Sequence, residues 1–205
     1  EDLKLIFNSP LYVGCMNSRQ REVAGNQVIK DHKYWLPLIA LYSGARMEEI
    51  GQSFLSDIGC EHGVHYLDIN TLGEDKSLKT ASSRRKVPLH KNIIAAGFID
   101  YVDDLQKKNE TKLFPELNKD KLGRCTRPFS KWYSRYTREL GISDKRKVFH
   151  SFRHSFKDAC RHAEIEESIH DAFTGHTNGS VGRGYGLGHN ITTLNKAIQQ
   201  IDFGI

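Results

Sequence analysis

Apolar residues recur at helical spacing over most of the chain, separated by short polar or glycine-containing breaks. Apolar side chains at every third or fourth position form one buried stripe along a helix, so this spacing predicts a mainly helical protein. The stretch 33–54 predicts two helices with a turn at Ser43 and Gly44, the second beginning near Arg46. Further helices are predicted over residues 91–107, 127–140, 151–163, 166–174 and 191–201.

Two segments have the pattern of strands instead. Residues 64–69 (VHYLDI) alternate in the manner of a half-buried strand, and residues 84–90 (RRKVPLH) contain a short strand closed by Pro88. The polar stretch between them, residues 70–83, suits a hairpin or a mobile turn. The chain is therefore predicted to have an α+β fold, mostly helical with one small antiparallel β-sheet.

The length of 205 residues fits one large domain, or one and a half small ones, and suffices for a substantial core. Residues 1–31 carry Asn-Ser-Pro and Gly-Asn breakers and polar clusters, so we expect a linker or lead-in there. The chain begins with Glu1 rather than methionine, which is compatible with a fragment of a longer protein. Residues 32–189 are expected to form the main domain, and residues 190–205 to add a C-terminal helix.

Composition narrows the class of protein only moderately. With 38% hydrophobic and 27% charged residues, the chain has the balance of an ordinary soluble globular protein. Its formal net charge of +5 is compatible with a nucleic-acid partner but does not require one. The four cysteines are widely spaced without a CxxC pair, which favours reduced thiols in the cytosol. The sequence contains no apolar run long enough for a membrane span, and its N-terminus lacks an export signal.

A pair of residues at the start of the second predicted helix could bind an anion. Arg46 and Glu49 are three residues apart, so they share a helix face and can form an ion pair. A surface ion pair is one interpretation. Because Arg46 closely follows Gly44 at a helix start, its guanidinium is also well placed, beside free backbone N–H groups, for a phosphate.

His150 and Arg153 repeat this spacing near the start of another predicted helix. Together they could bracket a phosphate, with the arginine bidentate and the histidine donating a hydrogen bond or exchanging a proton. The alternative is a helix that carries two solvent-facing polar residues. A zinc site at His150 and His154 is disfavoured, because the glutamate of HExxH and a third ligand at suitable spacing are missing.

The polar turn between the two strands contains further candidates. Lys79 is either a solvated charge or a proton donor on a mobile turn that reaches into a site. The basic run Arg84, Arg85 and Lys86 either contacts a nucleic-acid backbone or is merely solvated.

The last candidates follow the helix predicted over 166–174. His176 comes directly after Gly175, and Tyr185 lies among glycines, which offer no side chains to pack against. A phenol has a pKa of about 10, so it attacks at neutral pH only if cations favour the phenolate or a base takes its proton. Arginines and a histidine nearby would do both, although a half-buried aromatic anchor is the commoner use of tyrosine.

These residues lie in four segments that resemble the tyrosine recombinase (phage integrase) family. Residues 38–50 (LIALYSGARMEEI) resemble its apolar helix and Gly-x-Arg turn, and residues 78–89 (LKTASSRRKVPL) resemble its lysine-bearing hairpin. Residues 150–156 (HSFRHSF) resemble its His-x-x-Arg-His box, and residues 174–185 resemble its Gly-His…Tyr segment. The resemblance extends over residues 35–185 in the family's order. It departs from the family in the residue before Gly-His, which is threonine rather than leucine, and in the many glycines around the tyrosine.

The resemblance implies the fold of the DNA breaking–rejoining catalytic domain and the activity of a site-specific recombinase or integrase. The implied reaction is phosphoryl transfer through a 3′-phosphotyrosyl intermediate, with no metal and no other cofactor. The implied catalytic residues are Arg46, Lys79, His150, Arg153, His176 and the nucleophile Tyr185, with Glu49 in support and with Arg84, Arg85 and Lys86 binding DNA.

The resemblance also implies partners and a location. Family members act as tetramers on two DNA duplexes, whereas the isolated fragment could be a monomer. Residues 1–31 would then lead in from a missing N-terminal DNA-binding domain, and residues 190–205 could be exchanged between protomers or pack on their own domain. The protein would be cytoplasmic and DNA-associated, encoded by a bacterial cell or by a phage or other mobile element. A resolvase or topoisomerase-type relative, and a DNA-binding accessory protein that does not cleave, are the alternatives.

Overall fold

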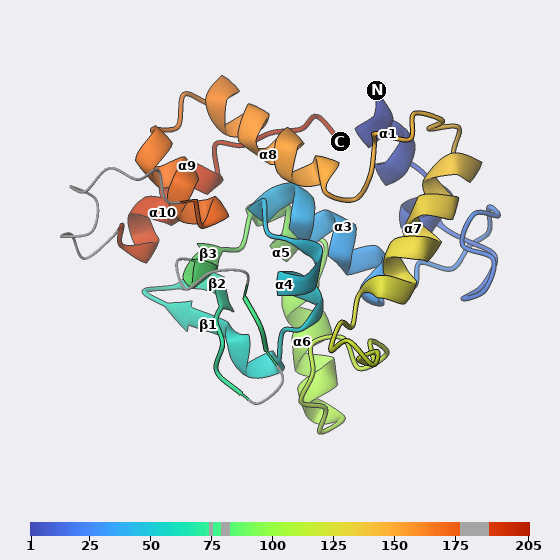
Figure 1. The fold of residues 1–205 in the computed structure, drawn as a ribbon, viewed down its shortest axis with the longest axis horizontal. Coiled ribbons are helices and arrows are strands. Elements are labelled where there is room, and N and C mark those ends of the chain that lie inside the picture. Colours follow the sequence, from blue (N-terminus) through green and yellow to red (C-terminus); the bar gives the residue numbers. More distant parts are fainter. Residues whose placement is uncertain (74–75, 79–82, 177–188) are drawn as a thin grey trace.

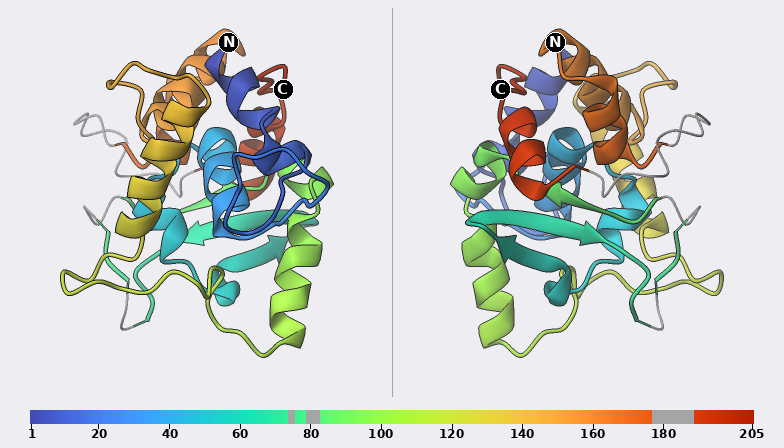
Figure 2. Two further views of the ribbon diagram at one scale, coloured as in Figure 1. Left: turned by 90° about the vertical axis from the view of Figure 1, so that its right-hand side faces the viewer. Right: turned by 90° about the vertical axis from the view of Figure 1, so that its left-hand side faces the viewer.

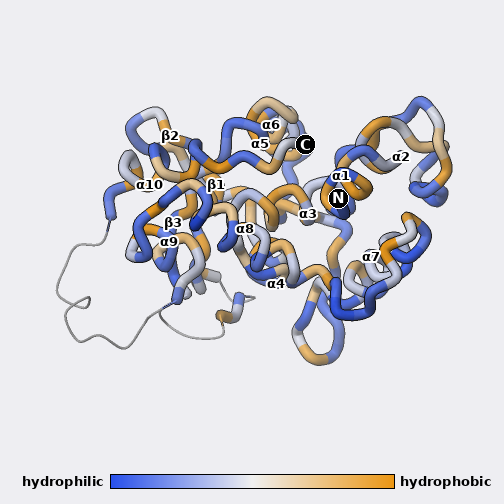
Figure 3. Tube along the Cα trace, turned by 90° about the horizontal axis from the view of Figure 1, so that it is seen from above, coloured by the Kyte–Doolittle hydropathy of each residue, from blue (hydrophilic) through white to orange (hydrophobic). Residues whose placement is uncertain are grey.

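Helix α3 (His32–Ser43) runs through the middle of the molecule, which we describe from a computed structural model over residues 1–73, 76–78, 83–176 and 189–205 (Figure 1). Every side chain of this helix from Tyr34 to Ser43 is buried. A helix that is buried on all sides cannot lie at the surface, so the other elements pack around it. Figure 3 shows its apolar positions inside the body of the domain.

A small antiparallel sheet in the order β1-β2-β3 contributes to the same core. Its strands are β1 (Ile58–Glu61), β2 (Val64–Ile69) and β3 (Arg85–Pro88). The turn between β1 and β2 is His62-Gly63, with positive φ at both residues (53° and 75°), as tight hairpins require. Both β2, from its alternation, and β3, as a short strand closed by Pro88, were predicted from the sequence. Strand β1 was missed, because its four residues (IGCE) do not alternate between apolar and polar.

The helices confirm the predicted α+β class (Figure 2). They are α1 (Asp2–Phe7), α2 (Pro10–Val13), α4 (Met47–Gly51), α5 (Lys91–Ala95), α6 (Phe98–Lys107), α7 (Arg127–Glu139), α8 (Ser151–His162), α9 (Glu167–Thr174) and α10 (Ile191–Ile198), together with a 3₁₀ turn η1 at Leu55–Asp57. The single helix predicted over 91–107 is in fact two, because Gly97 adopts φ 85° between α5 and α6. No helix among the described residues is long and apolar enough to cross a membrane.

The N-terminal segment packs against the rest of the domain, and its role as a linker or lead-in from a further domain stays a prediction. Ile6, Phe7 and Leu11 of its two short helices are buried. The fully buried Arg21 forms an ion pair with Asp31, which also caps the first turn of α3. A few apolar anchors among many polar residues therefore hold the segment in place, and hydropathy averaged over the segment conceals them.

Helix α10 packs on its own chain. Leu194 and Ile198 are buried in the core, where the helix lies against β3. The side chain of Gln199 accepts a hydrogen bond from the backbone N–H of Lys91 (2.8 Å) and donates to the carbonyl of Leu89 (3.1 Å). These bonds join the C-terminal segment to the start of α5. Exchange of this helix between protomers stays a prediction.

Buried His90 should make the fold sensitive to mild acid. Its ring stacks on Tyr42 with centroids 4.4 Å apart, and its Nδ1 accepts a hydrogen bond from the backbone N–H of Asn92. Burial lowers the pKa of His90 from 6.5 to about 4. The unfolded chain therefore takes up this proton at a higher pH than the folded chain. Protonation of His90 should therefore leave the free energy of unfolding unchanged above pH 6.5. As the pH drops towards 4, it should lower this free energy by at most about 3 kcal/mol.

The variant His90→Asn tests this expectation, because asparagine keeps a capping side chain but does not titrate. The free energy of unfolding, measured with urea between pH 4 and pH 7, should depend less on pH in the variant than in the wild type. Equal pH dependence in the two proteins would show that His90 does not carry the effect.

Candidate active site

The turn after α3 places Arg46 at the start of α4. Gly44 ends α3 in the left-handed region (φ 64°), and a side chain there would come within 2.5 Å of the Phe156 ring. The Glu49 carboxylate accepts a hydrogen bond from the backbone N–H of Arg46 (2.8 Å) and pairs with the Arg46 guanidinium (2.6 Å). The structure thus contains the ion pair expected from the spacing, but the Glu49 side chain is buried rather than on the surface.

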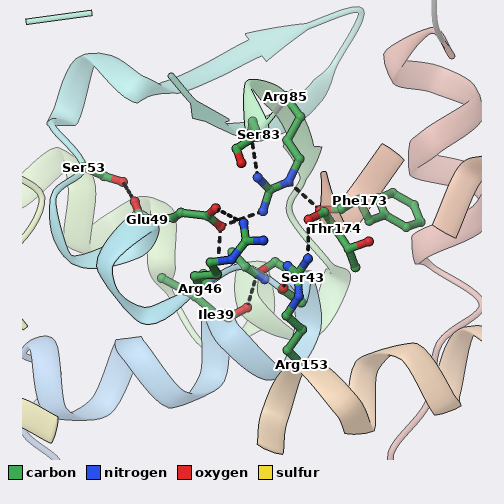
Figure 4. Close-up of polar contacts among 12 residues, drawn as sticks. Ile39, Ser43, Arg46, Glu49, Ser53, Ser83, Arg85, Arg153, Phe173 and Thr174 are labelled. Carbon is green, nitrogen blue, oxygen red and sulfur yellow. Dashed lines mark hydrogen bonds and ion pairs between the residues drawn. The ribbon is translucent and has the colours of Figure 1, made fainter. Parts of the chain in front are cut away.

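Arg153 extends from the first turn of α8 into the same region and is only 3% exposed. One terminal nitrogen donates to the carbonyl of Gly44 (2.5 Å) and the other to the carbonyl of Thr174 (Figure 4). The side chain therefore joins the ends of α3 and α9. Among the described residues, no carboxylate lies within ion-pair distance of Arg153, so its charge is not neutralised by direct contact.

Arg85 reaches the centre from β3. Its Nη2 lies 2.8 Å from Oε2 of Glu49, its Nε donates to the carbonyl of Phe173 (2.6 Å), and its Nη1 donates to the carbonyl of Ser83 (2.6 Å) (Figure 4). The side chain is 6% exposed. One carboxylate consequently holds two guanidiniums, those of Arg46 and Arg85.

The basic run Arg84, Arg85 and Lys86, which begins just before β3, does not lie on one face. Successive side chains of a strand point to opposite faces. Lys86 is exposed and pairs with Glu61 (2.6 Å), and the exposed Arg84 donates to the Thr71 hydroxyl. Arg85 points inward. This corrects the sequence-based assignment, because its buried side chain is not placed for a direct contact with DNA. DNA binding by Arg84 and Lys86 stays a prediction.

The inward direction of Arg85 could have been inferred from the alternation of the strand. Arg85 is two residues from Val87, which is buried and belongs to the core. Residues two apart on a strand share a face, so a core-facing Val87 places Arg85 on the core side. Treating Arg84, Arg85 and Lys86 as a single basic run concealed this signal.

Two guanidiniums contact the carboxylate of Glu49 in this centre, and a third, that of Arg153, lies nearby without contacting it. Burial alone would raise the pKa of the Glu49 carboxyl, but the charge and hydrogen bonds of Arg85, with donors from Arg46, bring that pKa below its ordinary value. Burial, with Arg46 and Arg85 nearby, lowers the pKa of Arg153 to about 10, which leaves it charged at neutral pH. The centre therefore has excess positive charge away from bulk water. Such charge is costly unless an anion pairs with it, and phosphate matches the arginine fork.

His150 and His176 line a cavity of about 280 Å³ together with Arg153. Its other lining residues are His154, Lys157, Asp158 and Arg161. Burial lowers the pKa of His150, helped by the charges of His154 and Arg153. Burial also lowers the pKa of His176, helped by Lys157 and Arg153. Both rings are therefore neutral near pH 7, when they can accept a proton or donate a hydrogen bond.

Of the seven residues predicted as catalytic or supporting, the structure brings together five, Arg46, Glu49, His150, Arg153 and His176. The other two of these seven, Lys79 and Tyr185, lie outside the described residues. Ser83, which follows residues 79–82, and His176, which precedes residues 177–188, contact or line the site. The arrangement can hold a tetrahedral anion between arginines, with neutral imidazoles beside it.

Comparisons with known proteins agree with this fold. The model of the Phage integrase family matches residues 22–186. Among solved structures, an integrase from mycobacterium phage Brujita is 17% identical with a TM-score of 0.55, over 85% of this chain and 53% of that one. The Tn1549 transposon integrase in complex with transposon right end DNA is 19% identical with a TM-score of 0.53, over 84% and 59%.

A third similar structure is the XerH site-specific recombinase bound to its palindromic difH substrate, a post-cleavage complex. It is 22% identical with a TM-score of 0.50, over 74% of this chain and 40% of that one. The present chain thus spans roughly half the length of these proteins. Among curated protein sequences, none matches it significantly.

Proposed function

This chain belongs to the phage integrase family, and on that premise we propose that it is a site-specific DNA recombinase or integrase that cleaves and rejoins strands through a 3′-phosphotyrosyl intermediate. The observation that carries the proposal is the excess of positive charge at this centre, with the buried Arg85 and Arg153 and the half-buried Arg46 near the carboxylate of Glu49. A scissile phosphate would supply the missing negative charge. The XerH and Tn1549 structures hold DNA, which supports duplex DNA as the ligand.

Tyr185 is the proposed nucleophile. Its phenolic oxygen attacks the phosphorus, the bond to the 5′-oxygen breaks, and the 3′-phosphate remains on the tyrosine. His150 accepts the phenolic proton, and Lys79 gives a proton to the leaving 5′-oxygen. Each such proton transfer is typically worth about 10²–10⁴ in rate. Attack by the 5′-hydroxyl of another strand reverses the step and joins the new strand.

The arginines are proposed to stabilise the charge that develops on the phosphate. Arg46 and Arg153 hold the non-bridging oxygens, and His176 donates a further hydrogen bond. A cation about 4 Å from an anion contributes on the order of 4 kcal/mol at an effective dielectric constant of about 20. Glu49 orients Arg46 rather than reacting, because its own charge would repel the phosphate.

A suicide DNA substrate tests the proposal. In a duplex nicked a few nucleotides downstream of the cleavage position, the short fragment that carries the new 5′-hydroxyl diffuses away, so a covalent protein–DNA adduct should accumulate and survive denaturation. An accessory protein would shift the same duplex in a native gel without forming the adduct. A topoisomerase-type relative would form the adduct and relax supercoiled plasmid without exchanging strands. Binding of a verified cognate site without any adduct would overturn the proposal.

We also propose that four copies act on two duplexes. The two strand exchanges of a recombination event need one cleaving subunit for each of four strands. The molar mass of the assembly on cognate DNA, measured by light scattering, should correspond to four chains and two duplexes.

The proposed role of His150 as a base predicts the pH below which the rate of cleavage falls. A base must be neutral to accept the Tyr185 proton, and the pKa of His150 lies below 6.5 because of burial and of His154 and Arg153. The imidazole should therefore stay neutral at pH 7 and become protonated only below pH 6.5. The second-order rate constant of cleavage at limiting DNA reports the free protein. It should be constant just above pH 6.5 and fall about tenfold per pH unit on the acid side.

A variant that removes a histidine outside the site controls for the loss of a histidine as such. His62→Gln removes an exposed histidine in the β1–β2 turn and should leave the profile unchanged. An acid limb centred above pH 6.5 in the wild type would rule out His150 as the base.

A further inference from the structure

Arg85 makes buried polar contacts to three separate parts of the site. Its partners are the carboxylate of Glu49 on α4, the carbonyl of Phe173 in the last turn of α9, and the carbonyl of Ser83 just before β3. All three guanidinium nitrogens are therefore occupied, and the side chain is 6% exposed. Because its side chain is buried and holds these three partners, Arg85 is placed to orient its neighbours rather than to contact the phosphate itself.

The first of these neighbours is Arg46, through the shared carboxylate. Oε1 of Glu49 contacts the guanidinium of Arg46, whereas Oε2 accepts from both the backbone N–H of Arg46 and the guanidinium of Arg85. Because Arg85 fixes one oxygen, the carboxylate cannot rotate away from this orientation. The single negative charge is also divided between two cations, so Arg46 keeps more of its positive charge for an incoming anion.

The second neighbour is the end of α9. The last carbonyls of a helix lack partners within the helix, and cations bind them favourably. Here Arg85 binds the carbonyl of Phe173, and Arg153 binds the carbonyl of Thr174. The approach is close: a side chain at Gly175 would come within 3.1 Å of Nη1 of Arg85. Two arginines from different elements thus fix the point from which the chain continues to His176.

We propose that Arg85 is a positioning residue for strand cleavage, which orients Arg46 through Glu49 and fixes the end of α9 ahead of His176. This inference rests on the proposed function. It differs from the DNA-contact role expected from the sequence, in which Arg85 would bind the backbone and affect DNA affinity rather than the chemical step.

The variants Arg85→Met, Glu49→Gln and their double combination test this role on the suicide substrate. Arg85→Met should lower the cleavage rate at saturating DNA about 10- to 100-fold, because small displacements of catalytic groups cost this much. The DNA concentration for half-saturation should change less than about threefold. If Arg85 acts through Glu49, the double variant should be no slower than the slower single variant. Arg85→Lys, which keeps the charge but not the fork, should recover part of the rate.

Arg21→Met is the matched control for lost stability. Arg21 is also a fully buried arginine that pairs with one carboxylate, Asp31, and donates to backbone carbonyls, those of Ser18 and Ile29. This variant should unfold more easily but cleave at the wild-type rate per folded molecule. A similar loss of rate in Arg21→Met would show that Arg85→Met reports general destabilisation, and this would overturn the proposal.

Two other results would also overturn it. One is a change only in the DNA concentration for half-saturation, as expected for a DNA contact. The other is full additivity of the rate losses caused by Arg85→Met and Glu49→Gln. Titration of the Glu49 carboxyl by NMR keeps the test separate from the proposed function, since it needs no cleavage. Its pKa should be higher in Arg85→Lys or Arg85→Met than in the wild type. An unchanged pKa would refute the Arg85–Glu49 link even if no adduct ever forms.

Discussion

Replacing Tyr185 with phenylalanine should abolish the covalent protein–DNA adduct on a suicide substrate while DNA affinity stays close to that of the wild type. Phenylalanine has the same ring but lacks the oxygen that would attack the phosphorus. A catalytic centre that has lost its nucleophile keeps its binding groups, so substrate binding and bond formation should separate cleanly. The adduct is measured on a denaturing gel, and the affinity on a native gel at fixed salt, because phosphate contacts make binding strongly salt-dependent.

Tyr101→Phe is the control for the loss of a hydroxyl group as such. The Tyr101 hydroxyl on α6 donates to the carbonyl of Leu113 (2.8 Å), a bond worth about 1 kcal/mol of stability. This variant should still form the adduct. If Tyr185→Phe forms the adduct too, another residue is the nucleophile, and mass spectrometry of the cross-linked peptide would identify it.

Arg153→Lys should lower the rate of cleavage by at least about 10²-fold. A lysine keeps one positive charge, but its single ammonium cannot reach the carbonyls of Gly44 and Thr174 and also bind a phosphate oxygen. Loss of one preorganised donor to a developing anion typically costs about 10²–10³ in rate. Single-turnover cleavage at saturating DNA measures the effect, and the melting temperature of the variant shows how much of it comes from lost stability.

A comparable arginine outside the site provides the control. Arg138 near the end of α7 donates to the carbonyl of Ile142 (2.5 Å), so Arg138→Lys removes a similar backbone contact. Its cleavage rate should stay within about twofold of the wild type. Equal rates for Arg153→Lys and the wild type would exclude Arg153 from the chemical step.

Local sequence signals were sufficient for the parts of the site that lie on single elements. Gly44 marks the end of α3 because only glycine readily takes its left-handed conformation, and this places Arg46 at the following helix start. Gly175 ends α9 in the same way and thus locates His176. The i, i+3 spacing was enough to bring Glu49 to Arg46.

Contacts between segments far apart in the sequence could not be predicted from such local signals. The partners of Arg153 lie 109 and 21 residues away in the sequence, and the Glu49–Arg85 pair joins residues 36 apart. Nothing in the composition of Arg84, Arg85 and Lys86 distinguishes the buried residue from its exposed neighbours. Only the alternation of β3 relative to Val87 does so, and four residues make a weak pattern.

The order of the contributing elements along the chain has a consequence for protein synthesis. Arg46, Glu49, Arg85 and Arg153 are all synthesised before the carbonyls of Phe173 and Thr174 that hold Arg85 and Arg153. A nascent chain that ends before α9 therefore lacks the acceptors that assemble the arginine centre. For an enzyme proposed to break DNA strands, this order confines strand breakage to chains whose synthesis has passed α9.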